Sequence, residues 1–294
     1  MAFQQLKGTG VALVTPFHKD GSIDHPALEK LVNHVIRGGV DFLVALGTTG
    51  ETPTLSNDEK QEVLGAVIKY CNERVPVVCG IGGNNTAEVV QQLKEYDLRG
   101  VTAILSVAPY YNKPTQEGIY QHFKAVSAAT NKQIILYNVP GRTASNILPA
   151  TVIRLAKECS NITSIKEASG NLAQCMELIQ HKPDGFTVLS GDDNLVLAQM
   201  AIGMEGIISV AANCFTKDMT DMINMAIVGK FDKARKVLYK ILPGIDLLFA
   251  EGNPAGVKCV LKHMDMCENV LRLPIVPVSA PTGKEIAQFV KNLA

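Results

Sequence analysis

The chain has 294 residues, and 47% of them are hydrophobic, which is enough apolar material for a continuous globular core. Its 28 basic residues balance 28 acidic residues, so the net charge gives no electrostatic reason to expect nucleic acid or an anionic membrane as a partner. No uncharged apolar run approaches the roughly 20 residues that span a bilayer, and the N-terminus lacks a signal-peptide pattern. We therefore expect a cytoplasmic protein with neither a nucleic-acid nor a membrane partner.

Apolar, strand-like runs alternate with segments of helical spacing along most of the chain. The expected strands cover residues 10–16, 41–46, 76–81, 102–108, 133–139, 162 to about 166, 186–190 and 206–211. Most of them are continuously apolar, which is typical of parallel strands covered on both faces. Eight successive units of this kind predict an α/β fold, a closed (β/α)8 TIM barrel. A doubly wound open sheet is the alternative, but no strand is followed by a well-formed dinucleotide fingerprint.

Helical spacing replaces the strands from about residue 230 onward. We expect breaks in these helices at Pro243-Gly244 and at Asn253-Pro254, because proline and glycine interrupt helices. The chain is therefore divided into a barrel domain, residues 1–229, and a C-terminal helical subdomain, residues 230–294.

Lys166 is unusual because it stands at the end of a strand that otherwise has buried character. With a side-chain period of two, Ile162, Ser164, Lys166 and Ala168 are expected on one face, where small neighbours leave the lysine room. A lysine amine that is partly removed from water becomes a usable nucleophile, as Schiff-base chemistry requires. The alternative is a lysine that extends its amine to solvent.

Other polar side chains follow neighbouring strands, at the end of the barrel where such folds carry their active sites. Tyr137 stands about one βα unit before Lys166, so its phenol is a candidate acid/base beside the amine. Arg142, in the loop that follows, offers a planar fork for a carboxylate. Gly47-Thr48-Thr49-Gly50 combines flexible glycines with hydroxyls that can gather around a small carboxylate. The paired Tyr110-Tyr111 suits a rigid exposed loop or a subunit interface.

A metal site finds little support in the sequence. The seven cysteines include no Cys-x-x-Cys pair, and the six histidines form no ligand pattern with a nearby acidic residue. Asp192-Asp193 is suited to a cation, but such a pair more often caps the following helix. We expect no metal and no cofactor.

Several motifs stand in the order and spacing of the dihydrodipicolinate synthase family, which the chain resembles over essentially its whole length. The motifs are Gly47-Thr48-Thr49-Gly50-Glu51, Pro109-Tyr110-Tyr111-Asn112, Tyr137-Asn138-Val139-Pro140-Gly141-Arg142, Ile165-Lys166-Glu167-Ala168 and Ser190-Gly191-Asp192-Asp193. Together they are far more specific than any one of them alone. The resemblance implies a class I aldolase-type lyase of lysine biosynthesis through diaminopimelate.

The resemblance also implies the catalytic residues. Lys166 would form an imine with pyruvate, and the derived enamine would attack the aldehyde of L-aspartate 4-semialdehyde. Thr48, Tyr137 and Tyr111 would form a proton relay, with Tyr111 reaching into the active site of a neighbouring subunit.

Substrate binding and assembly follow from the same likeness. Thr49 would hold the pyruvate carboxylate, Arg142 would guide the semialdehyde, and the backbone around Gly191 and Ile208 would line the pocket. The family is typically a homotetramer built as a dimer of dimers, which is the assembly we expect.

Lysine inhibits some members of the family at a pocket near the dimer interface. Asn84, Glu88 and Tyr110 match residues of that pocket. Asn57 and Lys60 stand where lysine-sensitive members often carry histidines, so lysine inhibition is left open. A positive charge at Lys60 would oppose a cationic ligand if it faced the pocket.

Two other functions compete with this interpretation. N-acetylneuraminate lyases and 2-keto-3-deoxy sugar acid aldolases resemble the chain at the lysine strand, but Thr48-Thr49 and Arg142 favour the synthase family. A non-catalytic barrel that binds keto acids is the other alternative. Such a relative is expected to have lost Lys166, Tyr137 or Thr48, and all three are present.

Overall fold

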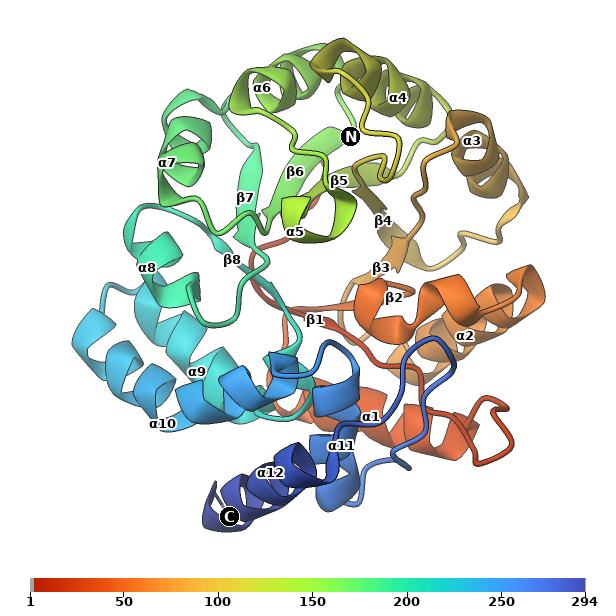
Figure 1. The fold of residues 1–294 in the computed structure, drawn as a ribbon. Coiled ribbons are helices and arrows are strands. Elements are labelled where there is room, and N and C mark those ends of the chain that lie inside the picture. The colour runs from red at the N-terminus through yellow and green to blue at the C-terminus, as the bar shows by residue number, and fades with distance from the viewer. Residues whose placement is uncertain (1–2, 294) are drawn as a thin grey trace.

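The computed structural model describes residues 3–293, which form a closed barrel of parallel strands surrounded by helices (Figure 1). The strands are β1 (Gly8–Ala12), β2 (Phe42–Ala45), β3 (Val77–Gly80), β4 (Val101–Val107), β5 (Gln133–Asn138), β6 (Ile162–Glu167), β7 (Thr187–Ser190) and β8 (Gly206–Ser209). Because β1 pairs with both β2 and β8, the sheet closes on itself. The predicted (β/α)8 barrel is confirmed, and the open-sheet alternative is wrong.

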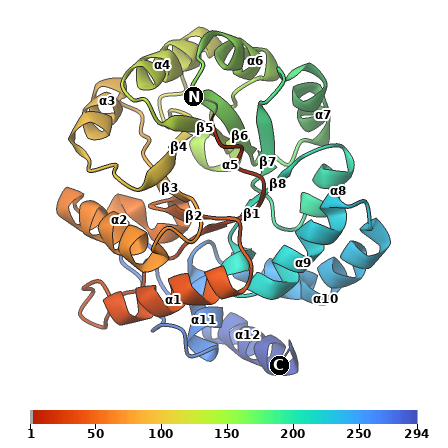
Figure 2. The ribbon, with the colours of Figure 1, turned by 180° about the vertical axis from the view of Figure 1, so that it is seen from behind.

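A helix follows each strand, as predicted. These helices are α1 (His25–Arg37), α2 (Asn57–Cys71), α3 (Thr86–Glu95), α4 (Gln116–Ala128), α6 (Pro149–Glu158), α7 (Leu172–His181), α8 (Val196–Ala201) and α9 (Thr216–Ile227). A short helix, α5 (Pro140–Thr143), lies over the barrel opening that faces the viewer in Figure 1. The N-terminal segment crosses the opposite opening, as the view from behind shows (Figure 2).

The seam between β1 and β8 depends on glycine. Gly8 and Gly206 are paired across it, and a Cβ added at Gly206 would lie 2.1 Å from the carbonyl oxygen of Gly8. The first strand ends at Ala12, four residues earlier than predicted. Leu13 and Val14 remain buried, but Val14 N–H donates to the side chain of Asn213 instead of to a strand. Buried loop residues therefore prolong the apolar pattern beyond the strand.

Two hydrophobic cores share the barrel. A large outer core lies between strands and helices, and a smaller inner core fills the barrel with residues such as Phe42, Val78 and Ile208. The pairing of β5 with β6 is irregular next to Ile134, and Ile162 belongs to the outer core. The prediction that Ile162 and Lys166 share one face is therefore wrong.

The C-terminal region is helical, as predicted, and contains α10 (Phe231–Phe249), α11 (Ala255–His263) and α12 (Ala280–Leu293). The expected break at Pro243-Gly244 is wrong, since α10 continues through both residues. Gly244 has no side chain to separate α10 from Phe289, whose ring would lie 2.3 Å from an added Cβ. The break at Asn253-Pro254 is confirmed. Buried residues of α10 and α11 belong to the same hydrophobic core as the barrel. The domain division at residue 229 stays a prediction.

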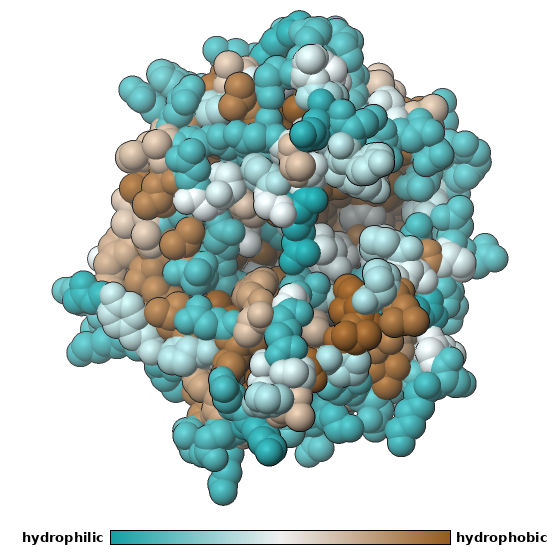
Figure 3. Space-filling view, viewed as in Figure 1, coloured by the Kyte–Doolittle hydropathy of each residue, from teal (hydrophilic) through white to brown (hydrophobic). Residues whose placement is uncertain are grey.

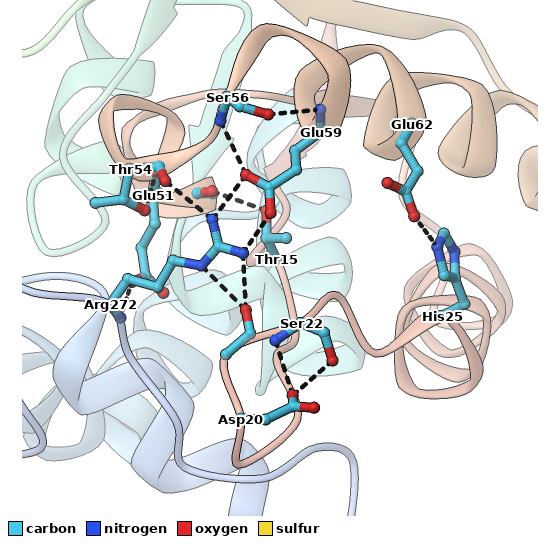
Figure 4. A network of polar contacts seen from close by, with 12 residues as sticks. Thr15, Asp20, Ser22, His25, Glu51, Thr54, Ser56, Glu59, Glu62 and Arg272 are labelled. Carbon is cyan, nitrogen blue, oxygen red and sulfur yellow. Dashed lines mark hydrogen bonds and ion pairs between the residues drawn. The ribbon is translucent and has the colours of Figure 1, made fainter.

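The segment between α11 and α12, residues 264–279, lies against the loop after β2 and helix α2, and we call it the strap. Arg272 in the strap donates hydrogen bonds to both carboxylate oxygens of Glu59 on α2, at 2.5 and 2.8 Å. Its guanidinium also reaches the carbonyl oxygens of Gly21 and Thr54 (Figure 4). One arginine therefore fastens the strap to two loops and a helix of the barrel.

The Glu59–Arg272 pair gives the stability a dependence on pH. The hydrogen bonds from Arg272 lower the pKa of Glu59 from 4.5 to about 2. A carboxyl whose pKa is lower in the folded state stabilises the fold above its unfolded pKa, and that stabilisation is lost as the pH falls from about 4.5 toward 2.

We expect wild-type protein to lose about 1–2 kcal/mol more free energy of unfolding between pH 6 and pH 3 than Glu59→Gln, allowing for partial exposure of the pair. Urea unfolding at both pH values measures this difference. Glu285→Gln, at an exposed carboxyl on α12, is the control and should retain the wild-type dependence. Equal pH dependence of Glu59→Gln and the wild type would contradict the prediction.

Candidate active site

Lys166 lies at the end of β6 with only 5% of its surface exposed. It is paired across the sheet with Tyr137 of β5, and its Nζ atom lies 4.4 Å from the centroid of the tyrosine ring. The alternative of a lysine that extends to solvent is therefore wrong. The structure places an amine and a phenol side by side in a largely dry setting, as the strand spacing predicted.

Gly191, directly after β7, makes room for the lysine. A Cβ added at this position would lie 2.9 Å from Cε of Lys166 and 2.5 Å from Cβ of Ala168. Ile208 of β8 is fully buried in the inner core together with Tyr137. Gly191 thus lies against the lysine, whereas Ile208 is placed only in the inner core that contains Tyr137, and the pocket-lining role of both stays a prediction.

One half-buried and one fully enclosed carboxyl, Asp192 and Asp193, lie near Lys166. Burial raises the pKa of Asp192 and of Asp193, and the positive charge of Lys166 opposes both shifts. Asp193 accepts hydrogen bonds from Ser209 Oγ at 2.5 Å and from the backbone N–H groups of Val210 and Ala211. Neither carboxyl caps α8, contrary to the expectation for this pair. Asp193 instead fixes the loop after β7 to the end of β8.

The loop after β2 turns sharply at Thr48–Gly50. Thr48 is exposed, whereas Thr49 is 2% exposed and its Oγ1 atom accepts a hydrogen bond of 3.0 Å from Asn253 Nδ2. Leu46 and Glu51, on either side of the turn, have positive φ values of 57° and 53°, which are costly for residues other than glycine. The surrounding contacts must hold this conformation.

A buried ion pair between Glu51 and Lys258 supplies such contacts. Both side chains are fully buried, and Lys258 Nζ also donates to the carbonyl oxygen of Val270 at 2.8 Å. The second carboxylate oxygen of Glu51 accepts from the backbone N–H of Arg272 at 2.9 Å. Burial lowers the pKa of Lys258, and Glu51 opposes this shift.

Sequence reasoning did not identify Asn253, Lys258 or a role for Glu51. Glu51 was visible as part of the glycine-threonine motif, but its partner stands 207 residues later. The sequence carries no local signal for that pairing.

A cavity of about 450 Å³ lies beside the ends of β2 to β5, and the space-filling view shows this face hollowed right of centre (Figure 3). Its lining includes Thr48, Tyr137 and Arg142 from the predicted active site. Asn84, Glu88 and Tyr110, the residues matched to the lysine pocket, line the same cavity together with Lys60. The structure thus brings three predicted active-site residues together with the residues matched to the lysine pocket in one hollow, whereas Lys166 and Thr49 are not part of its lining.

Tyr111 lies apart from this set within a single chain. It is 87% exposed and has a φ of 74°. The loop that carries it is held by Asn84 Nδ2, which donates to the carbonyl oxygen of Tyr110 at 3.3 Å. The structure therefore leaves this side chain exposed and outside the lining of the cavity.

Within residues 3–293, no group of three or more histidine, cysteine or acidic side chains is arranged to hold a metal ion. In the same part of the chain, no helix has the length and apolarity to cross a membrane.

The fold and the buried lysine define the chain as a class I aldolase-type lyase built on a (β/α)8 barrel. The profile of the Dihydrodipicolinate synthetase family matches residues 5–293. The chain is 51% identical over 291 residues to a 4-hydroxy-tetrahydrodipicolinate synthase of Flavobacterium psychrophilum, covering 99% of each. This chain belongs to the dihydrodipicolinate synthase family.

Solved structures of the family are closely similar. A dihydrodipicolinate synthase of Thermotoga maritima superimposes with a TM-score of 0.96 at 38% identity, covering 99% of each chain. The chloride-inhibited synthase of Acinetobacter baumannii, solved in complex with pyruvate, gives a TM-score of 0.95 at 40% identity, covering 98% of this chain and 99% of that one.

The Glu51–Lys258 pair predicts strong coupling in stability. Glu51→Gln is expected to lower the free energy of unfolding by about 3–5 kcal/mol, because it leaves a buried ammonium without its counter-charge. Adding Lys258→Met should recover part of that loss, since no buried charge then remains. Urea unfolding of the four proteins completes a double-mutant cycle.

The exposed pair Lys217–Asp221 provides the control, for which Lys217→Met and Asp221→Asn should couple by less than about 0.5 kcal/mol. Additive effects of Glu51→Gln and Lys258→Met would contradict the prediction.

Proposed function

We propose that this chain catalyses the 4-hydroxy-tetrahydrodipicolinate synthase reaction, the condensation of pyruvate with L-aspartate 4-semialdehyde on the diaminopimelate route to lysine. The observation that carries the proposal is the buried amine of Lys166 beside Tyr137. The names of the close relatives and the pyruvate complex of the A. baumannii synthase support the choice of substrates.

In the proposed reaction, Nζ of Lys166 attacks the carbonyl carbon of pyruvate, and loss of water gives an imine. Removal of a proton from the methyl carbon gives an enamine. Its carbon forms a bond with the aldehyde carbon of the semialdehyde, and the aldehyde oxygen takes up a proton. The semialdehyde amine then attacks the imine carbon, which closes the ring and releases Lys166.

Tyr137 is the acid/base that we propose for imine formation, because its ring is the aromatic group against the amine. Thr48 and Tyr111 would pass protons between Tyr137 and solvent, as the family resemblance implies. For Tyr111 this requires a neighbouring subunit, because the residue is 87% exposed and does not line the cavity of its own chain.

We assign the pyruvate carboxylate to Thr49. The hydrogen bond from Asn253 occupies a lone pair of the Thr49 hydroxyl, so the hydroxyl proton is left to donate to an anion. Gly191 and Ile208 would line the pocket around the keto acid. Arg142, which lines the cavity, would receive the carboxylate of the semialdehyde.

We propose a homotetramer, a dimer of dimers, as the working assembly. The exposed and conformationally costly Tyr111, beside the 40% exposed Tyr110, is suited to burial against a second copy of the chain. Seven free cysteines, six of them buried, fit a reducing compartment, and we propose the cytoplasm.

Regulation by lysine is not part of this proposal. Asn84, Glu88 and Tyr110 line the cavity, but so does Lys60. Its positive charge opposes a cationic ligand at that position.

The first test is turnover of pyruvate and L-aspartate 4-semialdehyde, followed through an added NADPH-dependent reductase. We expect wild-type turnover and loss of at least about a thousandfold in Lys166→Ala, because the covalent route is removed. Lys182→Ala, at a partly buried lysine near the opposite barrel end, should retain turnover. Absence of turnover by folded wild-type protein would sink the proposal; trapping of pyruvate by borohydride would then separate another aldolase from an inert barrel.

A second test concerns the space beside the lysine. Gly191→Ala is expected to slow borohydride-trappable imine formation by at least about tenfold, since its Cβ would displace Lys166. Gly65→Ala on α2, where an added Cβ meets nothing within 4 Å, is the matched control. Unchanged imine trapping by Gly191→Ala would contradict the prediction, since the lysine would then tolerate the displacement.

A further inference from the structure

Glu167 follows Lys166 directly and points to the outer side of the barrel, where it is fully buried. Its carboxylate oxygens accept from Asn138 Nδ2 at 2.9 and 3.2 Å, from Ser169 N–H at 2.8 Å and from Gln174 Nε2 at 3.1 Å. Burial raises the pKa of Glu167, and these hydrogen bonds oppose the shift. The carboxyl is thus an acceptor surrounded by nitrogen donors.

Asn138 follows Tyr137 in the same way and is also fully buried. Its Nδ2 donates to Asn146 Oδ1 at 2.8 Å, and its Oδ1 accepts from the backbone N–H of Ile147 at 2.9 Å. Residues 139–146 form the loop that carries Arg142. Asn138 therefore binds the far end of the loop that it begins.

Asn146 and Gln174 complete the arrangement by exchanging hydrogen bonds of 2.8 and 3.2 Å. Gln174 lies on α7 and is 7% exposed. We call Asn138, Asn146, Glu167 and Gln174 the Glu167 network. Each polar side-chain atom of the four has a hydrogen-bond partner, so the network is fully satisfied and should be rigid.

We propose that the Glu167 network positions Lys166, Tyr137 and the Arg142 loop relative to one another, with Glu167 and Asn138 as positioning residues that do not touch substrate. The strand register carries this inference. Tyr137 is paired with Lys166 and, one residue on, Asn138 is paired with Glu167. A bond between the outward pair therefore fixes the separation of the inward pair.

The proposal rests on the proposed function for its kinetic consequences. The Lys166 amine must meet the keto carbon while Arg142 holds the second substrate, and small displacements of reacting groups are costly in rate. One network that reaches both the lysine strand and the Arg142 loop would hold the Lys166 amine and the Arg142 side chain in fixed relative positions.

The chemistry of the carboxylate makes the proposal testable. A glutamine has one acceptor oxygen and an NH2 group, so Glu167→Gln keeps the shape but turns one N–H donor toward other N–H donors. We expect Glu167→Gln to slow imine trapping and to lower kcat at least about tenfold, and to raise the KM for the semialdehyde several-fold.

Asn146→Ala separates the two halves of the network. It removes the side-chain bonds of Asn146 to Asn138 and Gln174, which are part of the hold on the Arg142 loop. The bond of Asn138 to the backbone N–H of Ile147 and the bonds of Glu167 to Asn138, Ser169 and Gln174 remain. We expect the KM for the semialdehyde to rise several-fold, while the rate of imine trapping with pyruvate stays within about twofold of wild type.

The control is Asn161→Ala. Asn161 directly precedes β6, at the end of the strand opposite to Lys166. Asn161 Nδ2 donates to the carbonyl oxygens of Ser127, Thr130 and Lys132, so its loss removes buried hydrogen bonds far from Lys166. This variant should lower the unfolding temperature without changing the trapping rate or either KM.

The expected result is a kinetic loss in Glu167→Gln that Asn161→Ala does not share at matched stability. Wild-type trapping and KM values in folded Glu167→Gln would overturn the proposal, as would equal losses in both variants. A crystal structure of Glu167→Gln tests positioning without substrate, since unmoved Lys166 and Arg142 would overturn it. Failure of the proposed function appears separately, as absent turnover in the wild type.

Discussion

The buried ion pair between Glu51 and Lys258 is the constraint on which the arrangement of the barrel mouth depends. Two fully buried charges can remain only if each satisfies the other and the backbone around them. Here the carboxylate also binds the strap at Arg272 N–H, and the ammonium binds Val270. The loop after β2 is therefore held in a costly conformation by groups that arrive from the other end of the chain.

The lysine site depends on contacts from both sides of the sheet. Inside the barrel, Gly191 leaves the space in which Lys166 lies against Tyr137. Outside it, Asn138 and Glu167 bond to one another where helices cover the strands. Since successive strand residues point to opposite faces, two adjacent positions supply first a reacting side chain and then a structural one. On β5 and on β6, the inward residue with a proposed catalytic role is thus followed directly by an outward residue that binds the neighbouring strand.

The repeating pattern made the barrel predictable, because eight apolar runs followed by helical spacing have few other solutions. Errors arose where tertiary packing prevailed over local propensity. Proline at position 243 did not break α10, which packs against α12 through Gly244. An irregular strand pairing moved Ile162 to the outer core, and the partners of Asp193 lie on the next strand.

The C-terminal region was expected as a separate helical subdomain, but contacts from its helices, its loop and the strap make it part of the candidate site. Asn253 donates a hydrogen bond to Thr49, and Lys258 forms an ion pair with Glu51. Arg272 binds Glu59 and the carbonyl oxygen of Thr54. Three separate positions therefore hold the loop after β2 and helix α2. None of these pairs is local in sequence, and each joins a buried or half-buried polar group to another. A barrel without this region would leave Glu51 and Thr49 unpaired. The loop that presents Thr48 and Thr49 therefore depends on the whole chain for its shape.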